Sequence, residues 1–277
     1  MKTLHALLVA LTLICFSSCD LDNFMFYPTQ RSSYSLRTDV IPEANREFVT
    51  MTSQGKKIYG YFVRSNGTYP GITVLYFHGN SDDLQAYWDR AELLYRTGVN
   101  VFIFDYQGFG MSEGSPSEAA LYADCRTALS YVLSRGDVSA SRLAFYGYSL
   151  GCAGGIDVAA YAFSPSCLVL EAPFASSSTI LQSGTLLDMP SSYVMKGEYN
   201  NAEKIKTVHA PLLILHGVND NFIDIDKNGA VVFDHANQPK EFIRVPGADH
   251  TGIPATMGAD NYISTIREFV LRYTATH

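Results

Sequence analysis

The pentapeptide Gly147-Tyr148-Ser149-Leu150-Gly151 is the stretch that most constrains how this chain can fold. An apolar run, residues 143–146, precedes it, and a string of small residues, 152–155, follows it. A serine between two glycines in this context is typical of a sharp turn from a strand into a helix, which exposes the hydroxyl above the sheet. Glycine is needed at both flanking positions because a side chain there would collide with neighbouring backbone. The pentapeptide therefore predicts a core strand that ends at this serine and a helix that begins directly after it.

Apolar runs and segments of helical periodicity alternate along most of the chain. The first two runs alternate around Ser53-Gln54-Gly55, which predicts an antiparallel hairpin, and several later runs are apolar throughout, as in strands buried on both faces. The predicted strands cover residues 47–52, 57–63, 72–77, 99–105, 142–146, 167–170, 211–215 and 241–245. Such alternation indicates an α/β fold, a mostly parallel sheet with right-handed crossovers and helices on both faces.

Apolar side chains at helical spacing predict the helices between these strands. Three such stripes are Leu84, Trp88, Ala91 and Tyr95; Leu121, Cys125, Ala128 and Val132; and Ile263, Ile266, Val270 and Tyr273. The second of these helices should begin with Ser115 as its N-cap, Pro116 at the first helical position and Glu118 as the capping carboxylate.

Residues from about 175 to 208 interrupt the alternation. They are rich in Ser, Met, Tyr, Lys and Asn, and they lie between two predicted strands, the sixth and the seventh of the sheet, that need only one crossover. We interpret them as a small cap that carries short helices over the site. A long crossover helix with ragged flanks is the alternative.

The N-terminus resembles a secretory leader. Residues 1–18 combine a basic start with an apolar stretch too short for a comfortable membrane span, and they end in small residues before Cys19. This pattern predicts a lipoprotein-type signal peptide, with Cys19 lipidated after cleavage, so that the protein is anchored to the membrane in a bacterial cell envelope. If Cys19 is incidental, the protein is secreted or periplasmic. Residues 19–45 are polar and aperiodic, and they form either a tether or a segment partly packed on the domain.

Composition excludes several classes of protein. A formal net charge of −7 with no basic stripe argues against a nucleic-acid partner, and an apolar fraction of 47% is ample for a large core. After Cys19 three cysteines remain, Cys125, Cys152 and Cys167, without the spacing of a disulfide framework or a zinc site. We interpret them as small buried hydrophobes. Cys152 is a conceivable rival nucleophile, but it does not occupy the turn position.

A serine hydroxyl needs a base to remove its proton, and His250 is the best candidate. It lies in residues 246–252, between the last predicted strand and the last helix, where a loop can place the imidazole over Ser149. His78 and His216 each precede a glycine directly after a strand, where a role in shaping the turn is expected. The other histidines lie in the leader, at the C-terminus or in polar connections: His5, His277, His209 and His235.

The imidazole in turn needs a carboxylate to fix its tautomer and to stabilise the imidazolium. Asp220 is the preferred residue because it lies on the loop directly after a core strand, although it could also be a simple turn-forming residue. Glu171, which ends the preceding strand, is the runner-up. Three other aspartates fit less well: Asp224, Asp226 and Asp249. The order Ser149, Asp220, His250 is the chain order of hydrolases with this kind of turn.

Two backbone N–H groups should stabilise the negative charge on the substrate oxygen. The turn presents the N–H of Leu150. The second donor is expected in the loop after the first parallel strand, and we assign it to Asn80, with Ser81 as the alternative.

Five motifs together resemble the Bem46-like group of α/β-hydrolases, which is related to serine aminopeptidases of the S33 family. They are His78-Gly-Asn80, the stretch from Asp105 to Gly114, Gly147 to Gly151, His216-Gly-Val-Asn-Asp220 and Gly247-Ala-Asp-His250. The resemblance covers residues 46–277. It implies an eight-stranded sheet whose second strand is antiparallel, hydrolase activity without a cofactor or metal, and the triad named above.

We therefore expect a serine hydrolase that cleaves carboxylic esters or thioesters through an acyl-enzyme, with a small acyl compound as its substrate. An amide hydrolase of the serine aminopeptidase type is the alternative, and an acidic pair that binds a substrate amine, for example with Glu171, would favour it. A non-catalytic binding protein that kept the fold is a third possibility, and the sequence argues against it because each catalytic position holds a competent residue.

Overall fold

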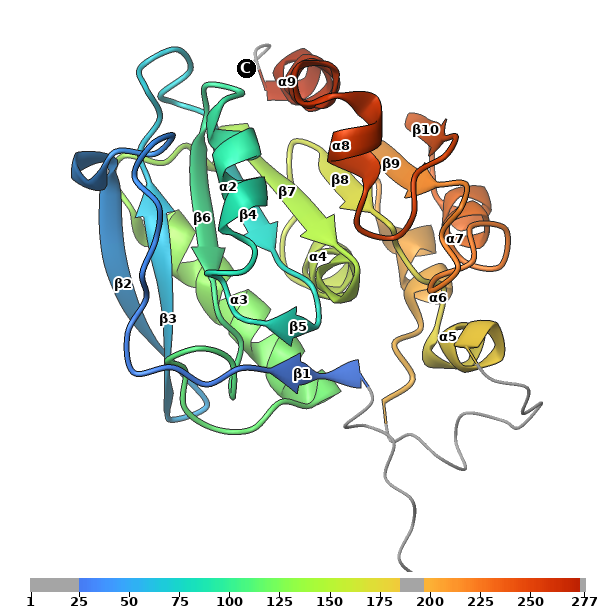
Figure 1. Ribbon diagram of the computed structural model, residues 1–277, viewed down its shortest axis with the longest axis horizontal. Coiled ribbons are helices and arrows are strands. Elements are labelled where there is room, and N and C mark those ends of the chain that lie inside the picture. The colour runs from blue at the N-terminus through green and yellow to red at the C-terminus, as the bar shows by residue number, and fades with distance from the viewer. Residues whose placement is uncertain (1–24, 185–196, 275–277) are drawn as a thin grey trace, which may run out of the picture.

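The computed structural model describes residues 25–184 and 197–274, and its central feature is a large sheet (Figure 1). In this part of the chain, eight strands follow the order β10-β9-β8-β7-β4-β6-β3-β2. β3 is antiparallel to its neighbours β2 and β6, and the other pairs are parallel. The strands are β2 (Arg46–Ser53), β3 (Lys56–Val63), β4 (Thr73–Phe77), β6 (Asn100–Phe104), β7 (Leu143–Tyr148), β8 (Leu168–Glu171), β9 (Leu212–Gly217) and β10 (Lys240–Val245). The predicted eight-stranded sheet, with its antiparallel second strand, is confirmed.

The sheet separates two hydrophobic cores. Alternate residues of a strand point to opposite faces, so Leu75 and Phe77 of β4 pack into one core and Val74 and Tyr76 into the other. The first core is covered by α3 (Glu118–Ser134), α4 (Leu150–Tyr161) and α7 (Gly229–His235). The second is covered by α2 (Trp88–Tyr95), α8 (Ile253–Met257) and α9 (Ala259–Thr274). Burial on both faces explains why the central strands are apolar throughout.

The predicted start of α3 was wrong by two residues. The helix begins at Glu118, and the Oγ of Ser117, not of Ser115, accepts a hydrogen bond from the N–H of Ala120 at 3.1 Å. The Glu118 carboxylate accepts hydrogen bonds from the backbone of residues 198–199 at 3.0 and 2.8 Å. The Glu118 side chain, which the local sequence pattern assigned to helix capping, therefore bonds to a segment distant in sequence instead.

The N-terminal segment packs against the sheet domain. Met25 and Phe26 are buried, and β1 pairs in parallel with β5 to form a separate two-stranded sheet. Among residues 25–45 Met25, Phe26 and Ile41 are buried and the others are exposed or half-buried, so the described part of the predicted tether, residues 19–45, is partly packed on the domain. The signal peptide and Cys19 lie outside the described residues. The short elements are β1 (Tyr27–Pro28), β5 (Ser81–Asp82), η2 (Glu43–Asn45) and η3 (Ala140–Arg142).

Part of the predicted cap, residues 175–208, is described. It contains α5 (Ser177–Gly184), α6 (Asn201–Lys204) and η5 (Ile205–Thr207), which follow β8 in the chain (Figure 1). Ile180, Tyr199 and Ile205 contribute to the same core as α4. Residues 185–196 lie outside the described residues, so the cap as a whole stays a prediction.

Candidate active site

Ser149 occupies the turn between β7 and α4 with φ 52° and ψ −116°, in a region that residues with a side chain rarely adopt. The two flanking glycines make this turn possible. A Cβ on Gly151 would lie 2.0 Å from the carbonyl oxygen of Phe77, and a Cβ on Gly147 would lie 2.8 Å from the Cα of Cys152. The helix can therefore approach the end of β4 only because these residues have no side chain.

His250 lies on the loop between β10 and α8 and faces Ser149. Its Nε2 is 3.0 Å from the Ser149 Oγ, and its Nδ1 is 2.8 Å from the Oδ2 of Asp220. An ionised carboxylate only accepts hydrogen bonds, so the proton belongs on Nδ1 and leaves Nε2 free to accept from the serine hydroxyl. Three residues separated by 30 and 101 positions thus form one hydrogen-bonded chain.

Asp220 lies three residues past the end of β9, and both oxygens of its carboxylate have hydrogen-bond partners. Oδ1 accepts from the N–H groups of Phe222 and Ile223 at 2.9 and 2.7 Å, and Oδ2 lies 3.3 Å from the Nε2 of His216. Burial raises the pKa of the Asp220 carboxyl, but the hydrogen bonds from His216 and His250 outweigh burial and hold that pKa well below its usual range. Asp220 is therefore ionised at neutral pH.

The alternative aspartates lie in other arrangements. Asp249 Oδ1 accepts from the backbone N–H groups of residues 251 and 252, and Asp224 Oδ1 accepts from those of residues 226 and 227. Asp226 forms an exposed ion pair with Arg244. Asp220 is the aspartate that the structure brings to His250.

Glu171, the runner-up, is also kept away from His250. Its Oε1 accepts from the Nη2 of Arg90 at 2.7 Å, and its Oε2 accepts from the hydroxyls of Tyr146 and Tyr262. Arg90 also donates to the carbonyl of Thr251 at 3.1 Å, next to His250. Sequence reasoning missed Arg90 as a support for the histidine loop. Arg90 lies outside the apolar stripe Trp88, Ala91 and Tyr95 of α2, so no periodic pattern marked it.

Asn80 and Leu150, the residues predicted to supply the two oxyanion donors, line the same pocket as Ser149. Asn80 follows β4 in the loop before β5, and Leu150 is the first residue of α4. In the described part of the chain, neither N–H donates to a protein acceptor. Ser81, the alternative, donates its N–H to the hydroxyl of Tyr87 at 3.2 Å. Asn80 is therefore the better placed of the two candidates.

A buried aspartate supports the same loop. Asp105, directly after β6, accepts from the N–H of Leu84 at 2.7 Å and from the hydroxyl of Tyr34, and its Oδ1 lies 3.2 Å from the Nε2 of His78. Complete burial raises the pKa of Asp105 above its ordinary value. The predicted turn-shaping role of His78 agrees with its burial and with its Nδ1 lying 2.8 Å from the carbonyl of Gly79.

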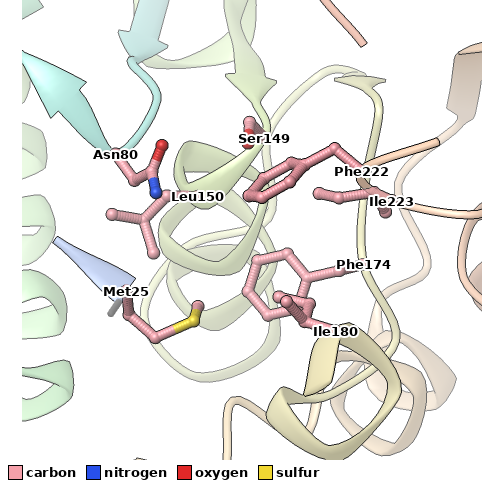
Figure 2. A pocket seen from close by; sticks show the side chains of 8 residues that line it. All are labelled: Met25, Asn80, Ser149, Leu150, Phe174, Ile180, Phe222 and Ile223. Atoms are coloured by element: carbon pink, nitrogen blue, oxygen red, sulfur yellow. The ribbon is translucent and has the colours of Figure 1, made fainter. Parts of the chain in front are cut away.

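An apolar pocket opens next to the serine (Figure 2). Ser149, Asn80 and Leu150 lie at one end, and the side chains of Met25, Phe174 and Ile180 gather at the other. Phe222 and Ile223 complete the lining. A pocket lined mainly by hydrocarbon, with the serine hydroxyl at one end, suits an apolar group attached to a carbonyl carbon.

Cys152, the rival nucleophile, is fully buried, and its thiol contacts the carbonyls of Gly147 and Glu171 at 3.3 Å. Burial raises the pKa of the Cys152 thiol well above its ordinary value, so it does not ionise at neutral pH. Cys125 and Cys167 are buried too, as predicted. Over residues 25–184 and 197–274, the histidines, cysteines and carboxylates form no group of three that could hold a metal ion. Over the same ranges, no helix combines the length and the apolar character of a membrane span.

Comparison with known proteins identifies the family. The family model for serine aminopeptidase, S33, matches residues 69–195. The protein YfhR of Escherichia coli K12 is 30% identical over 256 residues, which cover 90% of this chain and 87% of YfhR. The human α/β hydrolase domain-containing protein 17B is 31% identical over 80% of this chain and 74% of its own length. The chain belongs to the α/β-hydrolase superfamily.

The fold of this α/β-hydrolase also matches solved structures. An esterase of Pyrococcus furiosus superimposes with a TM-score of 0.73 over 90% of this chain and 97% of its own, at 18% identity. At that identity the likeness concerns the fold. The fold and the family together confirm the α/β-hydrolase assignment that the five sequence motifs indicated.

Proposed function

We propose that this α/β-hydrolase is a serine hydrolase that cleaves carboxylic ester or thioester bonds through an acyl-enzyme intermediate. The observation that carries the proposal is the hydrogen-bonded chain of Ser149, His250 and Asp220, with distances of 3.0 and 2.8 Å. A serine, a base and an orienting carboxylate within hydrogen-bond reach are the arrangement that nucleophilic catalysis requires.

The proposed reaction has two halves. In the first, His250 Nε2 takes the proton from the Ser149 hydroxyl while the oxygen attacks the carbonyl carbon, and the N–H groups of Asn80 and Leu150 bind the oxyanion. When the tetrahedral intermediate collapses, the protonated imidazole gives its proton to the leaving alcohol or thiol. In the second half, His250 takes a proton from water as the water attacks the acyl-serine, and the imidazolium then returns that proton to the Ser149 oxygen as the acid is released.

Two features favour an ester or thioester over an amide. The pocket beside Ser149 is lined mainly by apolar side chains. Glu171 is the carboxylate that could have bound a substrate amine. It is already hydrogen-bonded to Arg90 and to the hydroxyls of two tyrosines. The amide alternative is supported by the serine aminopeptidase model, which matches residues 69–195. Assays of p-nitrophenyl esters against aminoacyl anilides separate the two, and faster cleavage of the anilides would reverse our preference.

The test of the mechanism is activity-based labelling. A fluorophosphonate probe should label the wild-type protein, and Ser149→Ala should abolish both labelling and ester hydrolysis. Cys152→Ala is the matched control because it alters the rival nucleophile three residues away, and it should keep both. Labelling that persists in Ser149→Ala would show that another residue is the nucleophile.

We also propose that Cys19 carries a lipid that anchors the enzyme to the membrane of a bacterial cell envelope. The proposal rests on the sequence pattern of residues 1–19. Growth with an alkyne-tagged fatty acid should label the wild-type protein and not Cys19→Ala, and the variant should leave the membrane fraction. Equal labelling of the two proteins would refute the anchor.

A further inference from the structure

Residues 25–31, here called the N-terminal strap, cross the loop that carries Asn80. The N–H of Tyr27 donates to the carbonyl of Asn80 at 2.7 Å, and the N–H of Thr29 donates to the carbonyl of Asp82 at 2.9 Å. The Thr29 hydroxyl also donates to the Asp82 carboxylate at 2.8 Å. These bonds include the β1–β5 pairing, so the strap is bonded to the loop by backbone and side chain together.

On its other side the strap is hydrogen-bonded to the loop after β6. The N–H of Gly110 donates to the carbonyl of Thr29, and the N–H of Arg31 donates to the carbonyl of Gly110, both at 2.8 Å. The Phe26 ring packs edge-on against Phe109 at 6.3 Å. The strap thus connects the loop after β4 to the loop after β6. Its bonds to the second loop restrain the movement of the first.

This position matters because Asn80 is one of the proposed oxyanion donors. Such donors are effective only when they are fixed in place before the reaction. Gly79, Asn80 and Ser81 are residue types that occur in turns of many conformations, so their sequence alone does not fix the backbone of this loop. The hydrogen bond from Tyr27 to the Asn80 carbonyl limits rotation of the peptide that follows Asn80, and so it helps to keep the N–H of Asn80 aimed at the site.

The first residue of the strap also lines the pocket. Met25 is 5% exposed, and Figure 2 shows its side chain at the end away from Ser149, on the opposite side from Ile180 and Phe174. The Met25 side chain therefore lies where the far end of a substrate chain attached at Ser149 would lie.

We propose that the N-terminal strap is a working part of the active site: its backbone positions the oxyanion loop, and Met25 sets the length of the acyl chain that the pocket accepts. The proposal rests on the proposed serine hydrolase function and deepens it. If the proposal holds, the substrate is an ester or thioester of an aliphatic acid. Met25, which lies outside the eight-stranded sheet, then determines how long the acyl chain can be.

The positioning role is tested by Tyr27→Pro, which removes the N–H that bonds to Asn80, with Tyr27→Ala as the matched control that keeps it. Misplacing a catalytic group by about 1 Å can cost about 100-fold. We expect kcat of Tyr27→Pro to fall about 10- to 100-fold, with KM changed less than about threefold, and Tyr27→Ala to stay near wild type. Similar melting temperatures would show that both variants fold. Equal kcat in the two variants would overturn the positioning role.

The specificity role is tested with p-nitrophenyl esters from acetate to palmitate. Met25→Ala should raise kcat/KM for long chains relative to acetate, and Met25→Trp should lower it about 10-fold or more, the effect of a few methylenes in an apolar pocket. Met25→Leu is the control of similar volume and should keep the wild-type profile. These variants change no backbone hydrogen bond, so they test the strap even if Tyr27→Pro fails to fold.

The two levels of the proposal fail in different ways. If the wild-type enzyme hydrolyses these esters but all Met25 variants share its chain-length profile, the specificity role is wrong while the serine hydrolase mechanism stands. If the wild-type protein hydrolyses none of the esters and the fluorophosphonate does not label Ser149, both the mechanism and the strap proposal fall.

Discussion

Two buried carboxylates at the ends of neighbouring strands meet very different partners. Glu171 ends β8, and Asp220 follows β9 by three residues. Both side chains are completely shielded from solvent. Glu171 is paired with the guanidinium of Arg90, and Asp220 with the imidazole of His250. From burial and position alone, the two could exchange roles.

The partners decide the roles. An arginine is always protonated in a protein, so Glu171 sits in an ion pair whose charges do not change. That pair fixes structure: Arg90 also binds the Thr251 carbonyl and lies with its Cζ 3.8 Å from the Tyr148 ring centroid. Histidine gains and loses its charge near neutral pH, so Asp220 can stabilise an imidazolium that forms only during the reaction. One region holds the loops in place, and the other has the partners that the proton transfer of the proposed reaction requires.

The largest expected effect is that of Asp220→Asn. An amide in place of the carboxylate leaves the wrong tautomer of the imidazole, and in a well-studied serine protease this change lowers kcat about 10⁴-fold. We expect a loss of that order in ester hydrolysis. The variant should remain folded at the assay temperature, as its melting curve will show, so the loss of activity is not a loss of folded protein. Activity within tenfold of wild type would show that Asp220 does not perform this role.

Glu171→Gln should instead act on stability. It leaves the guanidinium of Arg90 buried without a counter-charge, and breaking a buried ion pair in this way costs about 3–5 kcal/mol. Urea denaturation should show a drop of that size in the free energy of unfolding. The control is Glu171→Gln combined with Arg90→Met, which removes the unpaired charge and should recover part of the loss. No recovery would mean that the ion pair is not the source of the effect.

The pH dependence should separate Asp220 from other acids. Its folded-state pKa lies below the unfolded-state value because the hydrogen bonds from His216 and His250 outweigh burial. Such a group stabilises the fold above the unfolded pKa, and this contribution disappears as the pH falls through the folded-state pKa. The stability difference between wild type and Asp220→Asn should therefore shrink progressively below about pH 4, the region of the ordinary carboxyl pKa. A difference that is constant from pH 6 to pH 3 would contradict the lowered pKa.

The sequence could predict the sheet and the residues that meet at Ser149 because both follow from local patterns. Apolar runs mark strands, and parallel strands bring the loops at their carboxyl ends to one edge. It preferred Asp220 to Glu171 from the position of the loop alone, and it could not show what binds Glu171 instead. That choice depends on Arg90 and Tyr262, which lie 81 and 91 positions from Glu171 and come from helices on the same face. Such contacts leave no periodic signal.

The errors have the same origin. The cap of α3 was misplaced because residues 198–199, 80 positions away, engage the carboxylate of Glu118. The strap escaped notice because β1 is two residues long and pairs with an equally short β5. A strand of that length has no alternation to detect. In each case a partner distant in sequence determined the local structure.

The smallest expected effect is at Phe222, on the exposed side of the Asp220 region. Its ring lies 5.1 Å from the imidazole of His250 at 64°, and the residue is 42% exposed. An edge-to-face ring contact contributes about 0.5–1.5 kcal/mol. Phe222→Leu, which keeps an apolar side chain in the pocket, should therefore lower kcat/KM only about 2- to 10-fold. Tyr161→Leu, an exposed aromatic at the far end of α4, is the control and should leave kcat/KM unchanged. A loss of 100-fold or more at Phe222 would mean that the position of His250 depends on this exposed ring more than on the buried Arg90–Glu171 pair.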